Sequence, residues 1–549
     1  MIRKLYTLFL LFITPFSLSA INISGKIEYQ RIHPKHIGTH SFLNKSNTTL
    51  EVSKQVLVEI INDEEETLFR TFTNDKGQYY FEDLEENIKI KIRVYARMLK
   101  ESSWDLKVLN NKDQKSLYAI EGKLHSTGTR NSIRNLIAPS SNKTAPPFAI
   151  LDSIYLAMKK VKSIDSHVNF PPLNIYWSTN NINTGSYYDG TNNIILQGDQ
   201  KGDSDEYDKH IIIHEWGHFF EEKLSRSDNI GGEHGENNHL DIRVAFGEGF
   251  GNALSAMVTD DPIYFDTFNN NGWNMNIEEG EKETSGWFSE ASVQRILYDL
   301  YDKHQDANDK LELGFKPIYQ VLTNGQKETP AFTSIFSFIH ELKKSMPQYT
   351  DEIDAIVAEE EIATIDDSYG SNRLFSTQDD NSNLYTELTI NQTLTKICTS
   401  NNYGIFNKLN NHKFIYFNVE NNNSYPFKIQ QYNGKNSNPE YSLFKTHPFK
   451  KISVKNKNFD GKEETTLTLE QGEYLIDIYD ENNVQKACFN LLIGKVSSLD
   501  FETPSNNSKI INQEKSVGIN ISDNKLLMIF FTLLVLFIPL FFIKKELKI

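Results

Sequence analysis

The sequence predicts a multidomain chain in which a central α+β domain lies between two β-sandwich modules and a transmembrane helix follows. Three observations support this fold class. Strands with alternating apolar residues occur in the first hundred residues and again over 385–500. Apolar segments with helical spacing fill much of 205–365, and 526–543 contains no charged residue. A length of 549 residues is enough for three soluble domains between two targeting segments.

Residues 1–20 have the composition of a secretory signal peptide. Two basic residues precede the apolar stretch 5–16, and small residues end the segment. We therefore expect an exported protein, with cleavage after Ser19 or Ala20.

The C-terminal segment 526–543 is just long enough to span a bilayer. The lysine-rich tail 544–549 should stay cytoplasmic, and the polar stretch 501–525 is expected to form a stalk. These features predict a single-pass membrane protein of the cell envelope or cell surface, with an extracytoplasmic N-terminal ectodomain.

The first module, 21–105, is predicted to be β-rich. Its Thr-Asn-Asp-Lys-Gly-Gln-Tyr-Tyr-Phe segment resembles a pattern of transthyretin-like, carboxypeptidase-regulatory sandwiches, with Asn74 where the pattern has Asp. Residues 106–146 are polar and are expected to link this module to the central domain. Strands and a hairpin are expected at 56–61, 73–81 and 88–94.

The central domain, 147–365, contains an H-E-x-x-H motif at 214–218. On a helix, imidazoles four residues apart lie one above the other, so His214 and His218 can converge on one Zn²⁺. Glu215 would then lie beside the metal, where a carboxylate can deprotonate a water molecule. The motif therefore predicts a metallopeptidase centre, and a buried helix with two incidental histidines is the alternative.

The segment around the motif has the signals of a helix. Ser204 is the expected N-cap, two acidic residues follow it, and Gly231 and Gly232 come after the end as helix breakers. Isoleucine and phenylalanine residues make the segment apolar on several sides, which is typical of a helix in a domain core.

A third metal ligand is expected on a following helix. The position six residues beyond the motif is Leu224, which excludes a third histidine there. Glu248 lies thirty residues beyond His218, and glycines on both sides of it allow close helix–helix approach. Asn252 is one turn further on the same face, where its oxygen could accept the free N–H of a ligating histidine.

Together these residues resemble the gluzincin metallopeptidases, which have a zincin-like fold. The run Gly-Glu-Gly-Phe-Gly-Asn is closest to the G-E-G-W-x-D motif of the fungalysin type, and the resemblance to thermolysin is more distant. The resemblance implies one catalytic Zn²⁺ held by His214, His218 and Glu248, with Glu215 as general base. Asn252 departs from the family, which usually has Asp at this position.

The residue that stabilises the oxyanion is left open by the sequence. The fungalysin segment comparable to 286–290 carries a histidine that this chain lacks. His234 and His239 are expected in a polar surface loop. The alternative is that one of them is a metal ligand. By resemblance, 193–198 is the candidate edge strand that pairs with substrate, with an ordinary interior strand as the alternative. Other possible oxyanion donors are Tyr264, Tyr298 and His340.

Helices should complete the central domain, and a β-rich module should follow a linker at 366–384. In that module, 385–500, the Gly-Glu-Tyr segment at 472–474 resembles bacterial pre-peptidase C-terminal sandwich domains. Cys398 and Cys488 could form one disulfide or remain two free thiols. The expected helices are 289–304, 316–323, 332–346 and 351–361.

The predicted function is an endopeptidase acting on protein or peptide substrates. A net charge of −16 argues against nucleic-acid binding, which needs basic surfaces. Two alternatives stay open: a surface adhesion or binding protein with an inactive zincin fold, and a zinc aminopeptidase. An aminopeptidase would need an acidic cluster, for which the candidates are Glu278, Glu279, Glu281 and Glu283.

Overall fold

A computed structural model of the chain describes residues 20–182, 185–268, 272–279, 284–303, 310–372, 384–452 and 461–495, all of which belong to one compact unit. The signal peptide, except for its last residue, lies outside these ranges, as do the stalk, the membrane segment 526–543 and the tail. Within the described ranges, no helix has both the length and the apolarity to cross a membrane.

Two sheets begin in the N-terminal part of the chain. The long strand β1 (Ala20–Ile37) pairs with β2 (His40–Val52) and with β5 (Gln78–Glu85) in the first sheet. Buried residues alternate with partly exposed ones along β1, because successive side chains of a strand point to opposite faces. The second sheet contains β3 (Val56–Asn62), β4 (Thr67–Phe72) and β6 (Lys89–Lys100).

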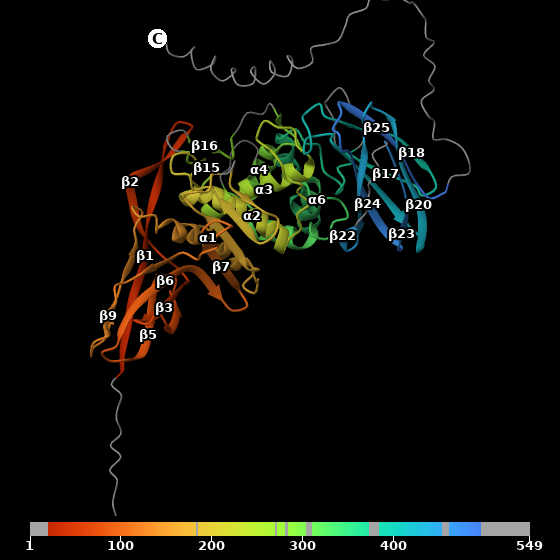
Figure 1. Cartoon of the computed structure of the whole chain (residues 1–549). Coiled ribbons are helices and arrows are strands. Elements are labelled where there is room, and N and C mark those ends of the chain that lie inside the picture. The colour runs from red at the N-terminus through yellow and green to blue at the C-terminus, as the bar shows by residue number, and fades with distance from the viewer. Residues whose placement is uncertain are drawn as a thin grey trace, which may run out of the picture. The chain divides into compact units, whose positions relative to one another are not determined.

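Residues 106–146, expected to be a linker, instead take part in both sheets. Strand β7 (Trp104–Leu109) pairs with β6 on one side and with β12 (Leu173–Trp177) on the other, so one sheet continues into the central part of the chain (Figure 1). The polar composition of the segment reflects its partly exposed edge positions. Its short strands are β8 (Ala119–Glu121), β9 (His125–Ser126), β10 (Ser132–Ile133) and β11 (Leu136–Ala138).

The first sheet also reaches the central part of the chain. Strand β2 pairs with β16 (Gly272–Asn276), and β16 pairs with β15 (Ile263–Asp266). The same buried core contains residues from both sheets and from the central helices. The first module and the central part therefore share strands and a core.

Three long helices pack together in the central part: α1 (Pro146–Ile164), α2 (Lys209–Leu224) and α3 (Ile242–Thr259) (Figure 1). Close approach of α2 and α3 depends on Gly251, because a Cβ atom there would lie 2.8 Å from Nδ1 of His214. Gly249 has the same role towards the next helix, where a Cβ would lie 2.6 Å from Cβ of Val293.

The helix that carries the motif begins later than expected. Ser204 precedes a single 3-10 turn, η1 (Asp205–Tyr207), and α2 itself starts at Lys209 with Asp208 as N-cap. The carboxylate of Asp208 accepts hydrogen bonds from the backbone N–H and the hydroxyl of Thr267 instead of capping the helix. A tertiary contact therefore fixes the start of α2, which local sequence signals do not reveal.

The helices expected downstream are present with shorter bounds. Ser289 caps α4 (Glu290–Asp299), and its side chain accepts a hydrogen bond from the backbone of Ser292. The others are α5 (Phe315–Gln320), the π-helical turn η3 (Val321–Gly325), α6 (Ile335–Ser345), the 3-10 turn η4 (Pro347–Tyr349) and α7 (Thr350–Glu359).

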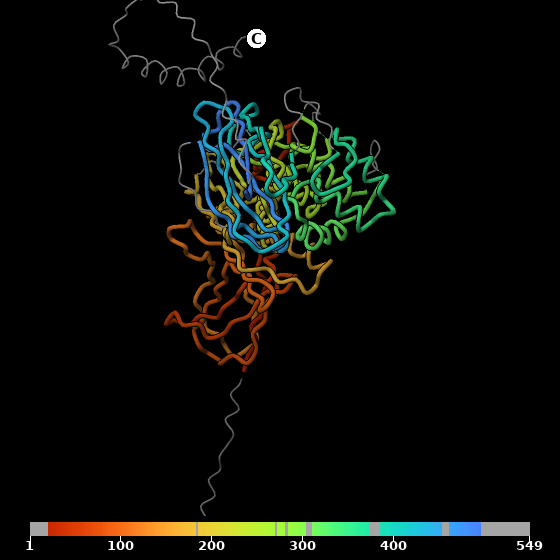
Figure 2. The backbone as a smooth tube through the Cα atoms, turned by 90° about the vertical axis from the view of Figure 1, so that its right-hand side faces the viewer, coloured from red at the N-terminus to blue at the C-terminus, as the bar shows by residue number. Residues whose placement is uncertain are grey.

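The C-terminal module, cyan to blue in Figure 2, is a two-sheet β structure. It has its own buried core. The disulfide Cys398–Cys488 joins β18 (Thr393–Ser400) to β25 (Lys486–Ile493), where the two cysteines are direct register partners. The four-stranded sheet has the order β18-β25-β20-β23, with β20 (Asn423–Asn433) and β23 (Lys462–Leu469). The five-stranded sheet has the order β17-β19-β24-β21-β22, with β17 (Tyr385–Glu387), β19 (His412–Val419), β24 (Gly472–Asp480), β21 (Pro439–Thr446) and β22 (Phe449–Ile452).

The described residues therefore form four sheets, with the helices in the middle of the chain.

Candidate active site

Helices α2 and α3 bring the three predicted ligands together. Nε2 of His214 lies 3.0 Å from Nε2 of His218 and 3.2 Å from Oε2 of Glu248, which is also 3.2 Å from Nε2 of His218. These atoms form a group of potential metal ligands from two adjacent helices. The spacing of four residues on α2 and the approach of α3 at Gly251 produce this geometry.

The donor set fits a zinc ion. Zinc bonds of about 2.0–2.1 Å in a tetrahedral site separate the ligand atoms by about 3.3 Å, close to the distances between these three atoms. Two imidazoles and one carboxylate are a set found in catalytic zinc sites, where a fourth position stays open.

Asn252 fixes the orientation of His214. Its Oδ1 lies 2.8 Å from Nδ1 of His214, and its Nδ2 donates to Oε1 of Gln294 on α4 at 2.9 Å. With the amide nitrogen committed to Gln294, Oδ1 accepts the Nδ1 proton, and Nε2 of His214 keeps its lone pair for a metal. The predicted contact is therefore present, and the residue that orients Asn252 was not anticipated.

The second carboxylate oxygen of Glu248 is also held. Asn229, in the loop 225–241 between α2 and α3, donates a hydrogen bond from Nδ2 to Oε1 of Glu248 at 2.9 Å. This loop is called the active-site loop below. Oε2 is therefore the oxygen of Glu248 that faces the two histidines.

Glu215 lies beside this cluster and is 7 % exposed. Its Oε2 accepts a hydrogen bond of 2.7 Å from the backbone N–H of Tyr188 in β13 (Tyr187–Tyr188). The contact aligns the carboxylate at the wall of a cleft of about 580 Å³. The cleft is lined by residues that include Tyr187, Tyr188, His214, Glu215, His218 and His234.

The edge of the sheet at this cleft is β13. Strand β14 (Asn193–Leu196), which corresponds to the expected edge strand 193–198, pairs with β12 on one side and with β13 on the other. Of the two alternatives for 193–198, the substrate-pairing edge strand is therefore wrong, and the ordinary interior strand is confirmed for β14. A two-residue strand such as β13 is too short for the alternation of apolar residues to reveal it.

His234 lies in the site, although the sequence predicted a surface position. Its Nδ1 lies 2.8 Å from Oε2 of Glu290, and its Nε2 lies 3.3 Å from Oε2 of Glu248. Burial lowers the pKa of His234, but the hydrogen bond to Glu290 and the charge of Glu248 outweigh it and raise the pKa to about 9. The position of this histidine in the segment 225–241, between the two ligand helices, was the signal that could have placed it near the metal position.

The other candidate residues have structural surroundings. Tyr264 is buried, and its ring centroid lies 6.3 Å from that of His214. His239 stacks between the rings of Phe288 and Tyr403, and Tyr298 packs against Tyr301. His340 is 4.0 Å from Glu341. Of the acidic residues considered for amine binding, Glu281 and Glu283 lie outside the described residues, and Glu278 and Glu279 do not line the cleft.

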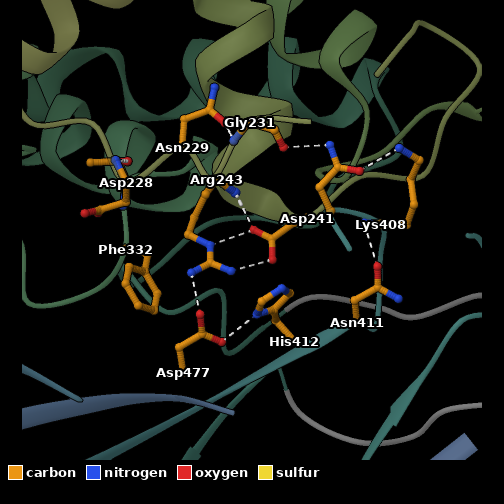
Figure 3. Close-up of polar contacts among 12 residues, drawn as sticks. Asp228, Asn229, Gly231, Asp241, Arg243, Phe332, Lys408, Asn411, His412 and Asp477 are labelled. Atoms are coloured by element: carbon orange, nitrogen blue, oxygen red, sulfur yellow. Dashed lines mark hydrogen bonds and ion pairs between the residues drawn. The ribbon is translucent and has the colours of Figure 1, made fainter. Parts of the chain in front are cut away.

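The C-terminal module holds the active-site loop. Nδ2 of Asn407 donates to the backbone oxygens of Gly231 and Glu233 at 2.8 and 3.0 Å, and Nζ of Lys408 also donates to the oxygen of Glu233. Figure 3 shows the contacts around Gly231 and Lys408. The loop that carries Asn229 and His234 is thus fixed by residues far along the chain.

A buried ion pair joins the same module to helix α3. Arg243, 2 % exposed, binds both carboxylate oxygens of Asp241 at 2.8 Å and Oδ2 of Asp477 on β24 at 2.8 Å (Figure 3). His412 donates to the other oxygen of Asp477 at 2.7 Å. The guanidinium also lies 4.8 Å from the ring centroid of Phe332.

The comparisons with known proteins relate the chain to peptidases. The family model of the mycolysin C-terminal domain matches residues 162–337, which include both ligand helices and the active-site loop. A search of curated proteins found no match.

Two solved structures are among those similar to parts of the chain. The pre-peptidase C-terminal domain of a collagenase from Bacillus anthracis is 14% identical with a TM-score of 0.17, and the match covers 21% of this chain and 99% of that one. PliG, a periplasmic inhibitor of g-type lysozyme from Aeromonas hydrophila, is 10% identical with a TM-score of 0.13, covering 20% of this chain and 94% of that one.

Proposed function

We propose that the chain is a zinc-dependent endopeptidase of the gluzincin type, in which His214, His218 and Glu248 hold one Zn²⁺. The observation that carries this proposal is the convergence of the three ligand atoms at 3.0–3.2 Å beside the carboxylate of Glu215. The relation to the mycolysin family supports a peptidase. The narrower similarity to fungalysin stays a prediction from the sequence motifs.

Glu215 is the proposed general base. A zinc ion at the site would supply a Lewis acid that activates water and polarises a peptide carbonyl. The hydrogen bond from Tyr188 holds Oε2 of Glu215, which leaves Oε1 to take a proton from the attacking water. Glu215 then passes that proton to the leaving amine.

His234 is the proposed donor to the oxyanion. It lies in the cleft with the ligands, and the hydrogen bond to Glu290 orients its ring and favours its charged form. A cation here would stabilise the negative charge that develops on the carbonyl oxygen. This assignment supplies the donor that the sequence left open.

Strand β13 is the proposed docking edge for the substrate. It is the terminal strand of its sheet and lines the cleft next to Glu215. An extended peptide could bind along this edge through backbone groups other than the N–H of Tyr188, which Glu215 occupies, and an internal bond of the substrate would then lie near the ligands. Such binding favours an endopeptidase over an aminopeptidase, which must recognise a free amine.

A peptide library tests the function. The zinc-loaded full-length protein should cleave internal bonds, a chelator should stop cleavage, and added Zn²⁺ should restore it. No cleavage by the zinc-loaded protein would support the binding-protein alternative and overturn the proposal. Release of single N-terminal residues would identify an aminopeptidase instead.

The proposed location follows from the terminal segments, 1–20 and 526–543. We propose that the protein is exported and tethered to a membrane of the cell envelope, with the candidate site outside the cytoplasm. Digestion of intact cells by an added protease should remove the domain that carries the site. Protection of that domain in intact cells would contradict this location.

A further inference from the structure

A second group of potential metal ligands lies apart from the histidine cluster. It consists of Asp203, Asp205 and Asp266, each of which offers one carboxylate oxygen within 4.8 Å of the others. Asp205 belongs to η1, directly before the helix that carries His214, and Asp266 ends β15. All of the side-chain donors are carboxylate oxygens, in contrast to the zinc-type set of two imidazoles and one carboxylate.

One oxygen of each of these carboxylates lacks a partner. Oδ1 of Asp203, Asp205 and Asp266 is buried and has no hydrogen bond in the described part of the chain. Asp205 is 2 % exposed, and its other oxygen accepts a hydrogen bond from the hydroxyl of Ser186. Buried carboxylate oxygens normally have donors or counter-ions, so three carboxylates of one group that each keep an unpartnered buried oxygen indicate a missing cation.

The negative charge around the three aspartates also indicates a missing cation. Asp208 is fully buried and adds a fourth carboxylate next to Asp205. No ion pair joins any of the four carboxylates to a Lys, Arg or His within the described residues. Burial, together with the neighbouring Asp203 and Asp266, raises the pKa of Asp205 well above its usual range. Without a cation, the fold would have to keep several of these carboxyls protonated.

We propose that Asp203, Asp205 and Asp266 bind a calcium ion. Ca²⁺ takes six to eight oxygen ligands, among them carboxylates in one- or two-oxygen contact, backbone carbonyls and waters. A ligand set that contains oxygen but no imidazole or thiolate selects such a hard cation over zinc. Mg²⁺ fits less well, because it keeps several of its own waters and demands strict octahedral geometry.

The site links three segments that surround the candidate active site. Asp205 precedes helix α2, and Asp266 follows helix α3 through β15, so one ion would connect the flanks of both ligand helices. Ser186, which donates to Asp205, lies two residues before Tyr188, whose N–H holds Glu215. Calcium would therefore stabilise the positions of the ligand helices and of strand β13 together.

Direct measurement of bound calcium tests the proposal without depending on peptidase activity. Full-length protein is dialysed against Ca²⁺ in a zinc-buffered solution, and its calcium and zinc contents are determined. The test protein is the double variant Asp205→Asn, Asp266→Asn. The matched control is the double variant Asp63→Asn, Asp113→Asn, which removes two exposed carboxylates from turns. We expect one Ca²⁺ per wild-type or control chain and none in the first variant, with equal zinc in all three.

Thermal unfolding provides a second readout that does not require the variant to bind metal. With calcium chelated, the Asp205→Asn, Asp266→Asn variant should melt at or above the wild-type temperature, because it lacks the repulsion between carboxylates. Added Ca²⁺ should raise the melting temperature of the wild type by several degrees and leave that of the variant unchanged, and Mg²⁺ should have a smaller effect.

Three results would overturn the calcium site. The first is that the wild-type protein binds no Ca²⁺, and the second is that the Asp205→Asn, Asp266→Asn variant binds as much Ca²⁺ as the wild type. The third is that the melting temperature of the wild type does not change with Ca²⁺ but rises when the pH is lowered. The last would show that the carboxyls share protons instead of a cation. Absence of zinc with Ca²⁺ still bound would contradict the proposed function and leave this inference standing.

Discussion

Three side chains at the metal position are each held by a neighbouring residue outside the ligand set. Hydrogen bonds of 2.8–2.9 Å fix the orientation of the His214 ring, of the Glu248 carboxylate and of the His234 ring. Orientation of this kind is what gives catalytic groups a fixed geometry before substrate arrives. The three pairs are His214–Asn252, Glu248–Asn229 and His234–Glu290.

Replacement of His234 should remove oxyanion stabilisation. We expect His234→Phe to lower kcat by about 10²–10³, with little change in KM and no loss of zinc, because the donor acts in the transition state. His239→Phe in the same loop is the matched control, since it keeps an aromatic ring between Phe288 and Tyr403. Steady-state kinetics and zinc content of both variants check this, and an unchanged kcat in His234→Phe would contradict it.

Helical spacing pairs His214 with His218 and Glu248 with Asn252, and the resemblance to gluzincins predicts that the two pairs share one metal site. His214, His218, Glu248 and Asn252 lie on helical faces, where neighbours three or four residues apart are adjacent in space. His234 lies in a loop, and its partner is 56 residues away on another helix. No period of the sequence encodes such a contact, so the sequence alone predicts a surface position for His234.

At the scale of elements, the active-site loop is held from two directions. Asn229 ties it to helix α3, and Asn407 of the C-terminal module ties it through the backbone of Gly231 and Glu233. Loops that carry functional side chains need such fixed points, because their backbone lacks the regular bonds of helices and strands. The C-terminal module is therefore part of the support of the site.

Removal of the Asn407 side chain should loosen this loop. We expect Asn407→Ala to lower kcat by about tenfold through misplacement of His234 and to decrease the hydrogen-exchange protection of the loop. Asn418→Ala, at an exposed position of the same module, should change neither quantity. Hydrogen exchange and steady-state kinetics are measured on both variants. Wild-type protection of the active-site loop in Asn407→Ala would refute the supporting role of Asn407.

Element boundaries show what sequence signals miss. The expected cap Ser204 starts a 3-10 turn, since Asp208 is engaged by Thr267 and α2 begins after it. Strand β13 has two residues, too few for a periodic pattern. Long elements with strong periodicity, such as α2, α3 and β6, were found from the sequence, and elements fixed by tertiary contacts were not.

At the scale of the whole molecule, the described N-terminal, central and C-terminal parts are joined by shared sheets and by a buried ion pair, and not only by linkers. Both N-terminal sheets continue into the central part through β7 and β16, and Arg243 joins helix α3 to β24. Pairing between strands distant in sequence leaves no local signal, so the sequence of 106–146 predicts a linker where the structure has strands.

The ion pair between Arg243 and Asp477 should contribute to global stability. Asp477→Asn leaves a buried guanidinium with one carboxylate partner fewer, and we expect a loss of about 3 kcal/mol in unfolding free energy. Urea denaturation measures this, with Glu473→Gln, an exposed position on the same strand, as the control. Equal midpoints for Asp477→Asn and the wild type would argue against a stabilising role.

The same pair gives a pH dependence of stability. Burial raises the pKa of Asp477, but the charges of Arg243 and His412 outweigh it and hold the pKa well below 3.8. The contribution is therefore fully present above about pH 4, the range of unfolded carboxyls, and is lost as pH falls through the folded pKa. The stability difference between wild type and Asp477→Asn should shrink below pH 4.

One comparison tests the central claim, that a zinc centre with Glu215 as general base hydrolyses peptide bonds. Zinc content and peptide cleavage are measured on the same preparations of wild type and Glu215→Gln. The account predicts one zinc per chain in both proteins, with cleavage by the wild type and a rate reduced by at least about 10³ in the variant. Cleavage by Glu215→Gln at the wild-type rate, or an active wild type without zinc, would contradict it.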